Sequence, residues 1–260
     1  MNQVIQKIEE SKNVFGSSQP FPHVVIDNFL DNPIAENLFK EFPDPSNGKM
    51  FTYNNPLEIK LALNDWNAFP PSTYSFLQYM NSNPVVQAFS DLIGIKLYPD
   101  NGLHGGGWHM HGPGGKLNPH LDYSLHPKLG LQRKLNLILY LTPRWSEEWG
   151  GHLGLWEHVE ATKQPGHLKA EVAPIFNRAL IFDTTKNSWH GISRLVSCPS
   201  GNFRRSIAIY YLCEPPENVD RRARALYAPT EDQKESPEIL DLIKKRADLS
   251  ASTGVYISKK

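Results

Sequence analysis

The chain has little cysteine, no excess charge of either sign and no long apolar run, and each absence excludes a class of protein. Two cysteines in 260 residues are too few to cross-link a secreted scaffold, and they lack C-x-x-C spacing, so we expect a reducing compartment. The 27 basic and 27 acidic side chains cancel, which removes the electrostatic argument for nucleic acid or an anionic membrane surface as the main partner. No stretch approaches the roughly 18 apolar residues that a membrane helix needs.

The sequence also lacks internal repeats, low-complexity tracts and the continuous apolar segment of a signal peptide. Hydrophobic residues make up 40% and charged residues 21% of the chain, close to the average of globular proteins. A chain of this length can bury its own core without disulfides. We therefore expect a soluble cytoplasmic protein in which residues 1–260 form one catalytic domain.

Residues 1–95 are expected to be mostly helical and to support the rest of the domain. A short buried strand is predicted at His23–Ile26, where an apolar run precedes a turn. Asn32 is placed to cap a helix that starts at Pro33, and apolar residues then recur at helical spacing. Two further helices are predicted between Ser72 and Ile95.

From residue 96 to 214, short apolar runs alternate with Gly, Pro and Asn clusters, which is typical of an antiparallel sandwich or barrel. The clearest strands are Leu135–Leu141, His152–Trp156, Arg178–Phe182 and Arg204–Leu212. Residues 215–260 are expected to form a peripheral tail with one amphipathic helix around Ile239–Ile243. The fold class is therefore predicted to be mainly β with helical cover.

One stretch places two metal-binding side chains close together. His120 and Asp122 are separated by one residue, so both project to the same face of an extended segment. A second histidine, His190, follows the apolar strand at Arg178–Phe182. Two histidines and one carboxylate on one face of a metal leave three open positions, which suits non-haem iron(II) and oxygen activation. His120, Asp122 and His190 are therefore the predicted metal ligands and catalytic residues.

Three further motifs occur in order around this triad. Arg133–Leu141 forms an apolar strand, Gly150-Gly151 turns into the next strand, and Arg204-x-Ser206 opens the last one. With these motifs, the stretch from His120 to Leu212 resembles the prolyl 4-hydroxylase-like branch of the iron(II) and 2-oxoglutarate dioxygenases. The resemblance implies a double-stranded β-helix core (a jelly roll, cupin-like), with the N-terminal helices packed on the major sheet.

The resemblance also implies Fe(II) as the metal, 2-oxoglutarate as co-substrate and O2 as oxidant, with ascorbate as a candidate reductant. In such enzymes a basic residue on the penultimate core strand binds the far carboxylate of 2-oxoglutarate. Alternation places Arg204 and Ser206 on one face of that strand and Arg205 on the other, so Arg204 is favoured as the anchor and Arg205 stays its rival. Tyr140 matches the family tyrosine that contacts the same carboxylate, and Asn136 shares its face. Asn136 and Ser206 are therefore also predicted to bind the co-substrate.

The implied reaction is hydroxylation of an unactivated C–H bond, coupled to conversion of 2-oxoglutarate into succinate and CO2. Peptidyl proline is the substrate that the resemblance favours, and a small molecule or a glycan precursor is the alternative. A non-oxidising, cupin-like metal- or ligand-binding protein is a further alternative, against which Arg204-x-Ser206 and Tyr140 count. In the Gly- and His-rich loop, His109 and His111 are candidates for contact with substrate or co-substrate.

Overall fold

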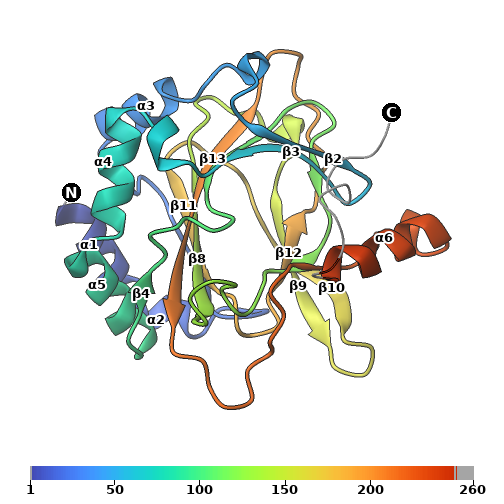
Figure 1. Ribbon diagram of the computed structural model, residues 1–260. Helices are drawn as coiled ribbons and strands as arrows, with labels where there is room; N and C mark the ends of the chain where they lie inside the picture. The colour runs from blue at the N-terminus through green and yellow to red at the C-terminus, as the bar shows by residue number, and fades with distance from the viewer. Residues whose placement is uncertain (1, 249, 251–260) are drawn as a thin grey trace.

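Two antiparallel sheets face each other in the computed structural model, which describes residues 2–248 and residue 250 (Figure 1). The larger sheet runs β1-β11-β8-β13-β5-β3-β2, with β4 paired to β13 and β6 paired to β3. Its strands are β1 (His23–Ile26), β2 (Phe51–Asn55), β3 (Glu58–Leu63), β4 (Tyr98–Pro99), β5 (Gly107–His111), β6 (Lys116–Leu117), β8 (Gln132–Tyr140), β11 (Arg178–Asp183) and β13 (Arg204–Cys213).

The smaller sheet runs β10-β9-β12-β7-β14. Its strands are β7 (His120–Leu121), β9 (Leu153–Val159), β10 (Gln164–Val172), β12 (Trp189–Ile192) and β14 (Leu226–Tyr227). From β6 to β14 the chain crosses between the two sheets at every step except β9 to β10, as strands do in a double-stranded β-helix. The predicted fold class is confirmed.

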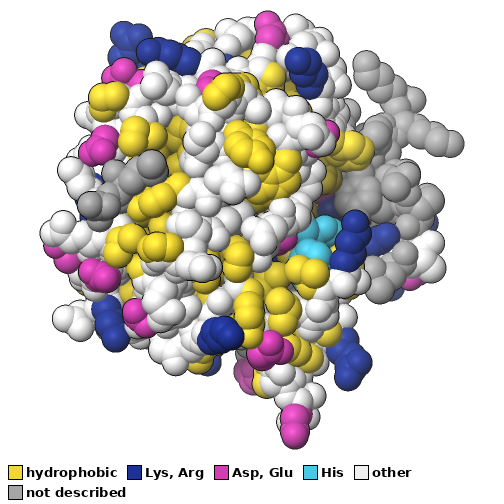
Figure 2. All heavy atoms as spheres, turned by 60° about the vertical axis from the view of Figure 1, so that its left-hand side comes forward, with side chains coloured by type: hydrophobic (Ala, Val, Ile, Leu, Met, Phe, Trp, Pro, Cys, Tyr) yellow, Lys and Arg dark blue, Asp and Glu magenta, His cyan; other side chains and the backbone are white. Residues whose placement is uncertain are grey.

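Helices cover the outer face of the larger sheet, on the left of Figure 1. They are α1 (Asn2–Glu10), α2 (Lys12–Phe15), α3 (Asn32–Lys40), α4 (Pro71–Met80) and α5 (Asn83–Ile93). Alternate residues of β8 and β13, such as Leu137 and Ile209, join the apolar faces of these helices in one buried cluster. Figure 2 brings this helical side forward and shows apolar side chains scattered among polar ones over it.

The space between the sheets is filled at one end by a second, smaller cluster and is open at the other. Tyr140, Leu153, Leu155 and Phe182 belong to this smaller cluster. The last helix, α6 (Pro237–Ala247), lies on the other side of the molecule from α1–α5 (Figure 1). No helix among the described residues is both long and apolar enough to cross a membrane.

The four predicted core strands and the predicted helices are present, with shifts of a few residues at their ends. One shift is at α3, where Asp31 is the N-cap and the helix begins at Asn32. The hairpin formed by β2 and β3 within residues 1–95 was not anticipated. Its strand β3 carries Glu58 and Lys60, which point into the space between the sheets and so hide the apolar alternation of a half-buried strand.

Candidate active site

A cavity of about 380 Å³ lies between the two sheets. Its walls come from β3, β5, β8 and β13 of the larger sheet and from β7, β9, β12 and β14 of the smaller one. Further residues line it from loops and neighbouring elements, among them residues 223–225 and Arg246 of α6. The position matches the usual ligand site of a barrel, at the mouth between its walls.

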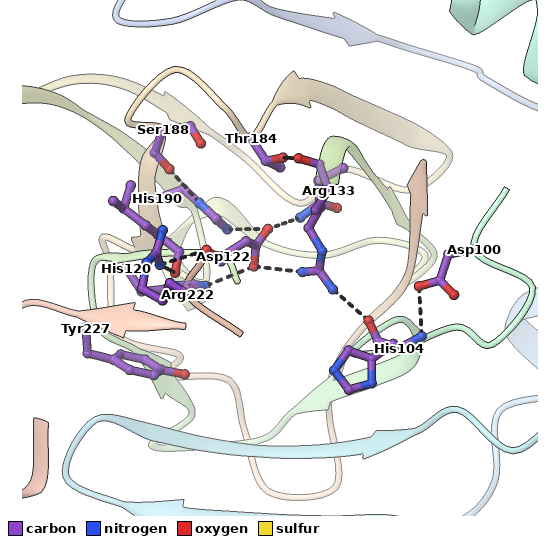
Figure 3. Close-up of polar contacts among 12 residues, drawn as sticks. Asp100, His104, His120, Asp122, Arg133, Thr184, Ser188, His190, Arg222 and Tyr227 are labelled. Atoms are coloured by element: carbon purple, nitrogen blue, oxygen red, sulfur yellow. Dashed lines mark hydrogen bonds and ion pairs between the residues drawn. The ribbon is translucent and has the colours of Figure 1, made fainter. Parts of the chain in front are cut away.

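The structure brings His120, Asp122 and His190 together in this cavity, with one ligand atom from each lying within 4.8 Å of the others. His120 pairs with His190 across neighbouring strands β7 and β12, and Asp122 follows β7 directly. His120 Nε2 lies 3.8 Å from Asp122 Oδ1, and His190 Nε2 lies 3.8 Å from Asp122 Oδ2 (Figure 3). We call these three residues the triad.

Backbone contacts fix the orientation of both triad imidazoles. His120 Nδ1 lies 3.0 Å from the carbonyl oxygen of Asn118, and His190 Nδ1 lies 2.8 Å from that of Ser188. A hydrogen on Nδ1 that bonds a carbonyl leaves Nε2 without a proton, and its lone pair then faces Asp122. The triad therefore offers two Nε2 atoms and one carboxylate to a metal, and this donor set suits Fe(II).

The protonation state of the triad also fits metal binding. Burial lowers the pKa of His120 to about 3 and lowers that of His190. Burial by itself raises the pKa of Asp122, but the charges of Arg133 and of the two histidines, together with the Asn136 hydrogen bond, outweigh it and the pKa falls to about 2. At neutral pH the imidazoles are neutral and the carboxyl is ionised, so a metal does not have to displace protons.

Asp122 is held from behind by two residues of β8. Arg133 Nη1 lies 3.2 Å from Asp122 Oδ1, and Asn136 donates to Asp122 Oδ2 at 3.2 Å (Figure 3). The Arg133 guanidinium lies 3.4 Å from the ring centroids of both Tyr123 and Tyr210. These contacts orient the carboxylate, as partners of metal ligands commonly do.

Sequence reasoning missed Arg133 as a site residue. Strict alternation from Asn136 would place Lys134 on the cavity side, but the pairing of β8 with β13 shifts in register between Tyr211 and Leu212. The shift turns Arg133 inward, and Lys134 instead pairs with Asp183 at 2.7 Å. The resemblance had favoured Asn136 as a co-substrate contact, whereas in the structure its amide binds Asp122. Contact with the co-substrate stays a prediction.

Arg204 and Arg205 lie on opposite faces of β13, as the alternation predicts. Arg204 is 3% exposed and lines the cavity, and its Nε donates to Gly151 O at 2.7 Å. Arg205 points toward the helical cover, over the rings of Phe39 and Phe203 at 5.1 and 5.8 Å. The geometry therefore favours Arg204 as the carboxylate anchor.

The predicted partners of Arg204 lie around its guanidinium. The Tyr140 ring lies 4.7 Å from it, within the smaller buried cluster. Burial raises the pKa of Tyr140, and the charge of Arg204 opposes this rise. Ser206 lines the cavity and pairs in register with Tyr140 across β8 and β13. Their contact with a co-substrate stays a prediction.

The Gly-Gly turn before β9 makes room for Arg204. A Cβ on Gly151 would lie 2.9 Å from Arg204 Cδ, and a Cβ on Gly150 would lie 2.3 Å from the carbonyl oxygen of Leu195. Both glycines also have positive φ, at 66° and 72°, where a side chain is strained. The close backbone approach expected from the sequence is present.

His109 and His111 lie on β5 beside the proposed anchor. His109 pairs in register with Ser206 and His111 with Arg204, and both histidines line the cavity. Burial lowers the pKa of His109 to about 3 and lowers that of His111 well below its usual value. Both ring nitrogens of His111 are buried without a hydrogen-bonding partner among the described residues, so they are available to a bound molecule.

We predict that the metal-free protein loses stability steeply as the pH falls below about 6.5. The fold keeps His109 and His111 neutral because their pKa values are lowered, whereas the unfolded chain protonates both near pH 6.5. Below that pH the unfolded state binds more protons, so these two rings alone lower the free energy of unfolding by on the order of 3 kcal/mol between pH 6.5 and 5. Urea unfolding in EDTA at successive pH values measures this loss.

The matched controls are His111→Gln and His167→Gln. His111 is 2% exposed, whereas His167 is exposed on β10. Only His111→Gln should therefore reduce the slope of the unfolding free energy against pH, by the equivalent of about one bound proton. An unchanged slope in His111→Gln would contradict the lowered pKa of this ring.

Comparison with known proteins agrees with this site. The 2OG-Fe(II) oxygenase superfamily matches residues 106–212. Prolyl 3-hydroxylase OGFOD1 of Xenopus laevis is 31% identical over 106 residues, which are 39% of this chain and 20% of that protein. The chain thus matches about a fifth of the length of that relative.

Solved structures of two prolyl hydroxylases share the fold. A prolyl 4-hydroxylase from Phytophthora capsici has a TM-score of 0.56 at 20% identity, covering 95% of this chain and 75% of its own. A prolyl hydroxylase from Trichoplax adhaerens, in complex with a hypoxia inducible factor peptide fragment, has a TM-score of 0.51 at 16% identity, covering 80% and 89%.

The matched segment, residues 106–212, contains the whole triad and Arg204. The folds agree over most of the chain, although the sequences differ at four positions in five. Residues 106–212 therefore match a 2-oxoglutarate–Fe(II) oxygenase domain, a family whose cofactors are Fe(II), 2-oxoglutarate and O2, and most of the chain shares its fold with prolyl hydroxylases.

Proposed function

We propose that the chain hydroxylates an aliphatic C–H bond of a proline-containing substrate, with Fe(II) held by the triad. The observation that carries this proposal is the convergence of His120 Nε2, His190 Nε2 and the Asp122 carboxylate in one buried cavity. When bound, Fe(II) and 2-oxoglutarate supply oxygen activation and the oxidation of the C–H bond, with release of succinate and CO2.

The residues of the chain would orient the reactants. The Arg204 guanidinium is buried without a carboxylate partner among the described residues, and its planar fork fits the far carboxylate of 2-oxoglutarate. Arg133 and Asn136 keep the Asp122 carboxylate turned toward the two imidazoles. The smaller buried cluster closes one end of the cavity and keeps bulk water from that side.

The match to a prolyl 3-hydroxylase and the shared fold with a peptide-bound prolyl hydroxylase support peptidyl proline as the substrate. A small-molecule substrate is the second candidate, because Arg246 of α6 pairs with Glu58 of β3 at 2.6 Å and so joins two walls of the cavity. The oxygenase family match counts against a non-oxidising binder. A cytoplasmic location and the use of ascorbate stay predictions from the sequence.

Anaerobic titration tests this function. Fe(II)-loaded protein is expected to develop the weak visible charge-transfer band of the 2-oxoglutarate chelate as 2-oxoglutarate is added, and succinate should form once O2 is admitted. The same titration with succinate in place of 2-oxoglutarate is the control, because succinate lacks the keto oxygen that completes the chelate. Bound iron without a band would sink the dioxygenase proposal.

A further inference from the structure

The cavity carries more positive charge than the proposed cofactors use. Four basic residues of its lining are largely buried: Lys60, Arg133, Arg204 and Arg246. The Lys60 side chain is 13% exposed, and the three arginines are 5% exposed or less. The acidic residues of the lining are Glu58 and Asp122. The lowered pKa values of the lining histidines leave these rings neutral. Among the buried residues, four cations therefore face two anions in a space of about 380 Å³. Arg224 also lines the cavity but is partly exposed to solvent.

Loading the site with its cofactors leaves this imbalance in place. The two positive charges of Fe(II) and the two negative charges of 2-oxoglutarate cancel each other. Arg204 would then pair with the far carboxylate of the co-substrate. Asp122 would coordinate the metal, so its negative charge would no longer balance Arg133, with which it pairs in the structure. Two positive charges remain without an equivalent anion in the cavity lining.

Lys60, Glu58 and Arg246, which we call the charged cluster, lie on the metal side of the cavity. Lys60 Nζ lies 2.9 Å from Glu58 Oε2, and Arg246 Nη1 lies 2.6 Å from Glu58 Oε1. The Arg246 guanidinium lies 4.9 Å from the Tyr227 ring, and that ring stacks on His120 at 5.2 Å (Figure 3 shows Tyr227 beside His120). One aromatic ring thus separates the cluster from a proposed iron ligand.

The pairing of β3 also places Lys60 toward the reaction space. Lys60 lines the same cavity as the triad, His109 and His111. Ala62, two residues along β3 and on the same face as Lys60, pairs in register with His109. Lys60 therefore faces the reaction space and does not only hold β3 to α6.

Two cations share one acidic partner in this cluster. Glu58 is 1% exposed and pairs with both Arg246 and Lys60, and Lys60 also lies 4.7 Å from the Tyr53 ring. The cluster therefore keeps one net positive charge at the cavity wall, where an anion would be bound favourably. Excess buried charge that faces a cavity is typical of a binding site.

We propose that the prime substrate carries a carboxylate, bound by Lys60 and Arg246 beside the metal; this inference rests on the proposed function. An ammonium group has three donors and a guanidinium five, so both can donate charge-assisted hydrogen bonds to an incoming carboxylate as well as to Glu58. Glu58 holds the two cations apart and orients them. Two sources fit this chemistry: an acidic side chain next to proline in a peptide, or the carboxylate of a small proline derivative.

Matched probe pairs test this inference by calorimetry on anaerobic protein loaded with Fe(II) and 2-oxoglutarate. One pair is a proline hexapeptide with glutamate next to the proline and its glutamine twin. The other pair is N-acetyl-L-proline and N-acetyl-L-prolinamide. We expect the carboxylate member of one pair to bind at least about tenfold more tightly than its amide twin, and the pair that shows this preference identifies the source.

Lys60→Gln should reduce that preference to less than about threefold, and Arg246→Gln should reduce it in the same direction. Lys49→Gln, at an exposed lysine outside the cavity, should keep the wild-type preference. Equal binding of the twins, no binding of either pair, or a preference that survives Lys60→Gln would overturn the inference. In each case a normal chelate band would leave the proposed function standing, while its absence would count against that function instead.

Discussion

Replacing His190 with alanine is expected to abolish Fe(II)-dependent turnover and to weaken Fe(II) binding by well over about a hundredfold. Substitution of residues that merely orient metal ligands costs about 10- to 100-fold, and His190 would be a ligand itself. Alanine removes both ring nitrogens, and the part of the chain that the structure describes holds no other group of three His, Cys, Asp or Glu ligands. Succinate formation measures the turnover, and competition with a chelator under anaerobic conditions measures the Fe(II) affinity.

His167→Ala is the matched control, because His167 is exposed and lies outside the cavity. Its iron affinity and turnover should equal those of the wild type. His190 also packs against Phe182 at 4.6 Å, so urea unfolding of both metal-free variants must show that each still folds. A folded His190→Ala protein that binds Fe(II) as the wild type does would remove His190 from the proposed ligand set.

The parts of the fold that follow a strict period could be predicted from the sequence. In β13, alternation placed Arg204 and Ser206 toward the cavity and Ile207 toward the helices, and the structure has them there. The same argument worked for the helices, where apolar residues recur at helical spacing because one face packs on the sheet. Local pattern is sufficient where each element buries one apolar face.

The pattern fails where polar residues face inward. Glu58 and Lys60 interrupt the apolar alternation of β3 because they face a cavity between the sheets. The hairpin was therefore not predicted. Arg133 turns inward because of a register shift, and a register shift depends on the partner strand β13 as much as on β8. Neither feature leaves a local signal in a single sequence.

The C-terminal segment shows the same limit over a longer distance. Its helix was expected and is present as α6, but the expectation of a peripheral tail did not place any of its residues in the cavity, which Arg246 enters. Arg246 meets Glu58 across 188 positions of the chain, at 2.6 Å. Helical spacing identifies which residues share a face, but it does not identify what that face will meet.

Arg204→Ala is expected to weaken 2-oxoglutarate binding by about 100-fold, with a much smaller effect on Fe(II) affinity. A hydrogen bond to a charged group contributes about 1.5–3 kcal/mol, and the buried guanidinium can donate two of them to one carboxylate. Because Arg204 lies outside the triad, iron should still bind. The concentration of 2-oxoglutarate that half-saturates the chelate band, measured anaerobically, reports the loss directly.

Arg205→Ala separates the two neighbouring arginines. This substitution removes the same charge from the same strand, but Arg205 faces Phe39 and Phe203 on the helical side. The concentration of 2-oxoglutarate that half-saturates the chelate band should therefore stay within about threefold of the wild-type value. Arg204→Lys should fall between wild type and Arg204→Ala, because an ammonium keeps the charge but loses the planar pair of donors. A larger effect from Arg205→Ala than from Arg204→Ala would transfer the anchor to Arg205, and it would mean that 2-oxoglutarate does not lie between the two sheets.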